Sequence, residues 1–103
     1  MAKTLGILVR SDKYLRHVIG LVKAAEKEGI DVNVFLTHTG VLLTQVPEFI
    51  ELSKTKANLS LCNVGYEAQG LKGKPAPGVP ETGFATQARN GAMIEECDRY
   101  VVM

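Results

Sequence analysis

Short apolar stretches without polar alternation are the feature that most constrains how this chain can fold. The first is TLGILV at Thr4–Val9, a run typical of a strand covered on both faces, as in a parallel sheet. DVNVFL at Asp31–Leu36 and LSLC at Leu59–Cys62 predict two further strands, and DRYVVM at Asp98–Met103 predicts a last one. Because both faces of such a sheet must be covered, the segments between the strands are expected to hold helices.

The segment after the first run has the spacing of an amphipathic helix. Apolar residues recur three and four positions apart over Tyr14–Glu28, and Gly29 is expected to end the helix. Ser11 and Asp12 are expected to cap its amino end. Further helices are predicted over 47–54 and 84–96, and a short helix or turn over 65–70. Loops are predicted over 37–40 and 71–83, with at most a brief strand at Val79.

The alternation of strands and helices predicts the α/β class. We expect one domain over residues 1–103, with a parallel or mostly parallel sheet flanked by helices in a Rossmann-like, three-layer sandwich. A chain of 103 residues with 46% apolar residues is long enough for one hydrophobic core.

Composition narrows the classes of partner. A net charge of +1 and 6% aromatic residues without tryptophan argue against nucleic-acid binding, which needs a basic face or stacking aromatics. No stretch approaches the roughly 20 apolar residues that span a bilayer, and the first residues lack a signal-peptide pattern. We therefore expect no membrane partner and a cytoplasmic location, where Cys62 and Cys97 would be free thiols.

The carboxyl ends of the predicted strands are where an α/β sheet usually binds ligands. Cys62 ends the third strand just before a predicted helix, and a helix amino end or a nearby lysine favours a reactive thiolate. The alternative is that Cys62 is a buried strand residue, as free cysteines often are. The expected binding residues around this edge are Arg10, His38, Asn63, Lys72 and Lys74.

Other residue patterns give no metal or cofactor site. The two histidines, His17 and His38, do not stand at metal-ligand spacing from each other or from the cysteines. GLKGKPAPG lacks P-loop spacing, and the segment after the first strand has no glycine to approach a phosphate. Cys97 is expected to pack between the last helix and the last strand. The apolar residues 41–43 fit either an oligomer interface or a turn in the core.

Three segments together resemble a known family. VNVFLTHTGV, the third strand ending at Cys62 with GL eight residues later, and the closing ECDRYVVM are similar to the DsrE/DsrF-like proteins, small sulfur-relay subunits. The resemblance extends over nearly the whole chain. It implies a compact parallel α/β fold that assembles as a trimer or hexamer.

The same resemblance implies a function for Cys62. In the family, the cysteine after the third strand accepts persulfide sulfur and passes it to a partner carrier. This chain would then be a cytoplasmic persulfide transferase or carrier with donor and acceptor proteins as partners, and the KGKPAPG loop would shield the intermediate. Asn63 departs from the family pattern, which often has glycine there. The alternative is a non-catalytic α/β subunit, or a module binding a small ligand or nucleotide, in which Cys62 is structural.

Overall fold

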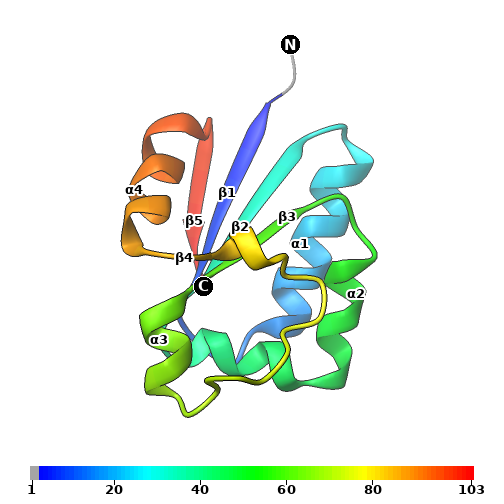
Figure 1. Cartoon of the computed structure of the whole chain (residues 1–103). Coiled ribbons are helices and arrows are strands. Elements are labelled where there is room, and N and C mark those ends of the chain that lie inside the picture. Colours follow the sequence, from blue (N-terminus) through cyan, green and yellow to red (C-terminus); the bar gives the residue numbers. More distant parts are fainter. Residues whose placement is uncertain (1–2) are drawn as a thin grey trace.

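A five-stranded, all-parallel sheet forms the centre of the molecule (Figure 1). The computed structural model describes residues 3–103. In the order β4-β3-β2-β1-β5, the sheet contains β1 (Thr4–Val9), β2 (Asp31–Leu36), β3 (Asn58–Cys62), β4 (Phe84–Ala85) and β5 (Arg99–Val102). The α-helices are α1 (Leu15–Lys27), α2 (Ile50–Ser53), α3 (Asn63–Ala68) and α4 (Gln87–Glu96). Three 3₁₀ helices complete the elements: η1 (His38–Gln45), η2 (Pro47–Phe49) and η3 (Glu81–Gly83).

The strand order explains why helices cover both faces. The chain steps from β1 to β4 in one direction along the sheet and then returns past β1 to β5. Because crossovers between parallel strands are right-handed, the reversal of direction moves the connecting helix to the opposite face. Figure 1 accordingly shows α1 and α2 on one side of the sheet and α4 on the other. The predicted three-layer α/β fold is confirmed.

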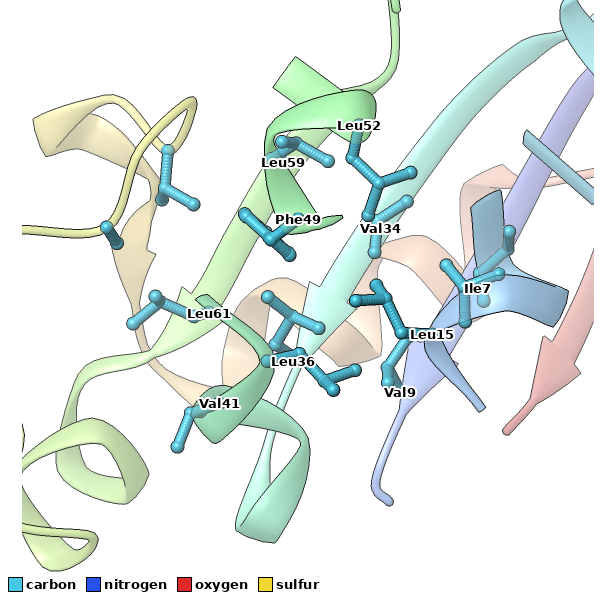
Figure 2. Close-up of a cluster of buried hydrophobic side chains, with 14 of the residues drawn as sticks. Ile7, Val9, Leu15, Val34, Leu36, Val41, Phe49, Leu52, Leu59 and Leu61 are labelled. Carbon is cyan, nitrogen blue, oxygen red and sulfur yellow. The ribbon is translucent and has the colours of Figure 1, made fainter. Parts of the chain in front are cut away.

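The main hydrophobic core lies between the sheet and the α1/α2 layer. Successive strand residues point to opposite faces, and the residues pointing to this one are aliphatic. Figure 2 shows them as a continuous layer with Leu15 of α1 and with Phe49 and Leu52 near α2. The strand residues of this layer are Ile7, Val9, Val34, Leu36, Leu59 and Leu61. Burying each such side chain contributes about 1.5–3 kcal/mol, so this face holds most of the stability of the fold.

The apolar stretch at 41–43 belongs to this core. Val41 and Leu43 are buried in it, and Leu42 packs against it. The reading of this stretch as an exposed oligomer interface is therefore wrong for Val41 and Leu43, whose side chains η1 turns inward.

The opposite face of the sheet is smaller and more polar. Leu8, Phe35, Cys62 and Met93 form its buried apolar cluster. Cys97 packs against this cluster, and the missing side chain of Gly6 makes room for it, since a Cβ there would lie 3.0 Å from the Cys97 Sγ. Cys97 thus has the packing role that its position predicts.

Around β4, the structure differs from the sequence prediction in two elements. Helix α4 begins at Gln87, because Phe84 and Ala85 pair with Leu61 and Cys62 as a short edge strand. Val79 forms no strand. It is buried in the α1/α2-side core instead.

Two local expectations also differ at the ends of β1 and β2. The side chains of Ser11 and Asp12 do not cap α1, whose N-cap is Tyr14 without a side-chain hydrogen bond; the Ser11 Oγ accepts from the Lys13 amide at 3.1 Å. The segment after β2 becomes the 3₁₀ helix η1 at His38 rather than an irregular loop.

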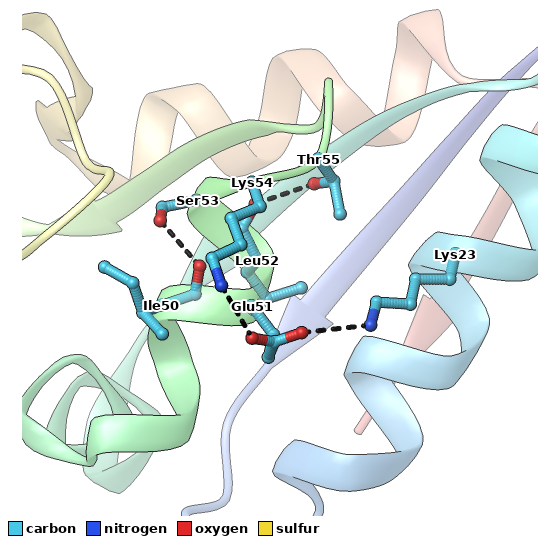
Figure 3. Close-up of polar contacts among 7 residues, drawn as sticks. All are labelled: Lys23, Ile50, Glu51, Leu52, Ser53, Lys54 and Thr55. Atoms are coloured by element: carbon cyan, nitrogen blue, oxygen red, sulfur yellow. Dashed lines mark hydrogen bonds and ion pairs between the residues drawn. The ribbon is translucent and has the colours of Figure 1, made fainter.

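A small ion-pair network joins α1 and α2 on the surface (Figure 3). The carboxylate of Glu51 accepts from Lys23 Nζ at 3.2 Å and from Lys54 Nζ at 3.3 Å. The hydrogen bonds from Lys23 and Lys54 lower the pKa of the Glu51 carboxyl below its ordinary value. Exposed ion pairs contribute little to stability individually. The Lys23–Glu51 pair nevertheless links two helices of one layer.

No helix within residues 3–103 is both long enough and apolar enough to cross a membrane.

Candidate functional site

Three residues form a row across the carboxyl ends of β2, β3 and β4. Cys62 pairs with Ala85, and Leu36 pairs with Leu61, so Thr37 comes next to Cys62 in the parallel register. Paired residues of a parallel sheet point to the same face, here the face covered by α4. The row Thr37–Cys62–Ala85 thus ends the sheet on its more polar side.

The two connections that leave this row diverge. The segment after β3 places Leu71, Ala76 and Val79 in the core on the α1/α2 side. The segment after β4 continues into α4 on the other side. In α/β sheets, ligands usually bind at the carboxyl ends of neighbouring strands whose connections go to opposite faces. Cys62 and Ala85 stand at this point.

The sulfur of Cys62 is held at the start of α3. Cys62 is the N-cap residue of this helix, and its Sγ accepts a hydrogen bond from the Gly65 amide at 3.4 Å. Gly65 adds no side chain beside the sulfur: a Cβ there would lie 3.7 Å from the Cys62 Sγ and 3.6 Å from the His38 amide nitrogen. Cys62 is 6% exposed. The thiol therefore has an amide donor and little contact with solvent.

A hydrogen bond from a neighbouring strand end crosses above this row. Gln87 Nε2, on the first residue of α4, donates to Thr37 Oγ1 at 2.9 Å. Gln87 follows β4 and Thr37 follows β2, and β3 lies between these strands. The bond therefore spans the carboxyl end of β3, where Cys62 lies.

Three of the predicted binding residues come together on the outer side of α3. Asn63, Lys72 and Lys74 line an open depression of about 440 Å³. The Tyr66 hydroxyl fixes its rim by donating to the Lys74 carbonyl at 2.7 Å. Cys62 does not line this depression. The loop that carries the lysines packs its apolar residues into the core on the α1/α2 side, away from the cluster that contains the Cys62 side chain.

Arg10 lies at the same edge but farther along it, whereas His38 directly follows Thr37 of the row. Arg10 follows β1, which β2 separates from β3. Its side chain is exposed, and its carbonyl accepts from the Gly40 amide at 3.2 Å and from Thr39 Oγ1 at 3.1 Å. His38 is exposed and has a φ of +50°, a conformation rare outside glycine. Within residues 3–103, neither side chain forms a hydrogen bond with a residue of this row.

The predicted site residues did not include Thr37, Gly65 or Gln87. Thr37 lies in the segment 37–41 after the second strand, where the sequence predicts ligand-edge residues, but His38 was the one predicted to bind. Gln87 was not detectable, because its position depends on a two-residue strand that carries no periodic pattern. Among residues 3–103, no three His, Cys, Asp or Glu side chains lie close enough together to hold a metal ion.

Comparison with known proteins assigns no family to this chain. No protein-family model matches the chain, and no curated protein matches it in sequence. The resemblance to DsrE/DsrF-like proteins therefore stays a prediction from the sequence.

Proposed function

We propose that this protein is a sulfur-relay protein that carries persulfide sulfur on Cys62. The observation that carries the proposal is the position of the Cys62 Sγ, where the connections after β3 and β4 diverge, with the Gly65 amide donating to it at 3.4 Å. The DsrE/DsrF-like resemblance supplies the cargo and extends the proposal to a cytoplasmic homo-oligomer, a trimer or hexamer.

The transfer consists of two exchanges at sulfur. The Cys62 thiolate attacks the outer sulfur of a donor persulfide, R–S–SH. A new S–S bond forms, the donor S–S bond breaks, and the donor leaves as the thiolate R–S⁻ with the bonding electron pair. An acceptor thiolate then attacks the outer sulfur of the Cys62 persulfide and releases the Cys62 thiolate, so no net oxidation occurs. The Gly65 amide would stabilise charge on the inner sulfur in both steps.

Access to the sulfur requires movement of its cover. With the Gln87–Thr37 hydrogen bond in place, Cys62 is 6% exposed, too little for a donor persulfide to reach it. The first turn of α3 lies beside the sulfur, and its Val64 is 70% exposed. We propose that donor and acceptor proteins dock over this turn and the lysine-lined depression next to it, and displace Gln87.

The experiment is persulfide loading followed by intact-mass measurement. The Cys97→Ser variant is incubated with a small persulfide donor and should gain the mass of one sulfur, which a reductant removes. The matched variant, Cys62→Ser, keeps Cys97 and should gain none. A Cys97→Ser protein that stays unmodified while a free thiol control is loaded would overturn the proposal.

A second candidate function is a non-catalytic binding module in which Cys62 is structural. The near-complete burial of the thiol favours it. Alkylation of the folded Cys97→Ser protein by iodoacetamide separates the two. Modification only at the rate of global unfolding supports the structural role, whereas faster modification supports the carrier.

A further inference from the structure

A cavity of about 370 Å³ lies between α4 and the sheet, apart from the strand ends discussed above. Its floor is the α4 side of β2 and β3, and its walls are α4 and the segment 78–83. The volume falls within the range of small-molecule sites. It is therefore large enough for a small ligand.

The floor of this cavity is polar, whereas the opposite face of the same two strands is aliphatic. Asn33, Asn58 and Ser60 alternate along the strands with the buried Val34 and Leu59. Asn58 Nδ2 donates to Asn33 Oδ1 at 2.8 Å, and Ser60 Oγ donates to the Val34 carbonyl at 2.9 Å. Within residues 3–103, the Asn58 side-chain carbonyl accepts no hydrogen bond. The floor thus keeps an acceptor for a ligand.

Opposite charges stand at the two ends of the α4 wall. Arg89 and Glu96 are seven residues apart, so they lie on one side of the helix, about 10 Å apart along its axis. Arg89 Nη2 donates to the Thr82 carbonyl at 3.1 Å, which fixes the guanidinium at the cavity rim. Neither side chain forms an ion pair with a described residue. Both charges are therefore available to a ligand.

We infer that this cavity binds a small zwitterion of the short-peptide type. The ligand carboxylate would pair with Arg89, its ammonium group with Glu96, and its amide groups with Asn58 and Ser60. An extended chain of three residues is about 10 Å long, which matches the rise along α4 between Arg89 and Glu96. The inference does not depend on sulfur transfer at Cys62.

Triglycine and its blocked forms test the charge pattern on the native chain. The ¹⁵N-labelled protein is titrated with triglycine, and the expected result is saturable shifts at Asn58, Ser60 and Arg89. Acetyl-triglycine and triglycinamide each keep one charge and should bind about 2- to 5-fold more weakly, the effect of one exposed ion pair. The doubly blocked peptide should bind weakest. Equal affinity of all four peptides, shifts elsewhere, or no saturation would overturn the inference.

Matched variants test the two side chains. Arg89→Gln and Glu96→Gln should weaken triglycine binding to the level of the corresponding blocked peptide on the native chain. The controls are Arg99→Gln and Glu95→Gln, which replace the same residue types at positions that do not line the cavity. Unchanged binding in both cavity variants, or equal loss in the controls, would contradict the assignment. If a cavity variant changes the NMR spectrum throughout the chain, its fold is altered. The charge pattern is then tested by the four peptides on the native chain alone.

Discussion

Replacing Gln87 with alanine is expected to uncover Cys62. The substitution removes the 2.9 Å hydrogen bond to Thr37 Oγ1 that spans the end of β3. A partly buried hydrogen bond contributes about 0.5–1.5 kcal/mol net. If the thiol reacts only when this bond opens, the same free energy makes opening about 2- to 10-fold more frequent. Cys62 alkylation should accelerate by that factor.

The rate is measured in the Cys97→Ser background with a small alkylating reagent under native conditions. Thr37→Val is the second variant, because it removes the acceptor hydroxyl at nearly constant volume and should give a similar acceleration. Gln69→Ala is the matched control: Gln69 is exposed beyond the end of α3. Thermal unfolding should show the Gln87 and Thr37 variants a few degrees less stable, at about 4–8 °C per kcal/mol for a domain of this size.

Two results would refute this reasoning. If the Gln87 variant loses stability but Cys62 reacts at the native rate, the bond supports the fold without covering the thiol. If the double variant accelerates alkylation by the product of the two single effects, the two side chains act separately rather than through one shared bond.

Three further substitutions test single contacts. Glu51→Gln should lower the free energy of unfolding in urea at pH 7. Because the folded pKa of Glu51 is lowered, this difference is present above its ordinary value of 4.5 and should vanish as the pH falls through the folded pKa. Gly65→Ala should raise stability by about 0.4–1 kcal/mol in thermal unfolding, since its new contacts at 3.6–3.7 Å are ordinary, and should slow Cys62 alkylation by covering the sulfur. Gly40→Ala should cost about 1–3 kcal/mol or more in the same assay, because its Cβ would overlap the Val9 carbonyl oxygen.

The central strands were predictable because their pattern is long and consistent. The runs at Thr4–Val9 and Asp31–Leu36 are strands with those bounds, and the parallel α/β class follows from their burial on both faces. β4 was not predictable, because Phe84 and Ala85 are too few to show a period and owe their conformation to pairing with β3. The start of α4 was misplaced for the same reason.

The candidate site was predictable as an edge but not as a set of contacts. The predicted ends of the strands indicate which residues lie at one edge of the sheet, and Cys62 and Asn63 are among them. Distances along that edge depend on strand order, which the sequence did not provide. The order β4-β3-β2-β1-β5 places Arg10 two strands from Cys62 and brings Gln87 across to Thr37.

The two faces of the sheet differ in role: the α1/α2 face holds the main hydrophobic core, and the α4 face holds both candidate sites. α1 buries four residues, Leu15, Val18, Val22 and Ala25, against an aliphatic surface, whereas α4 buries only Met93 against a face that carries Asn33, Asn58 and Ser60. An element with so few buried apolar contacts opens at lower free energy than one that anchors the core. Since α4 begins with Gln87, its opening would uncover Cys62 while the α1/α2 side stays packed. The same weak packing leaves the cavity beneath α4, where Asn33, Asn58 and Ser60 take the place of apolar residues that would extend the cluster around Phe35 and Met93.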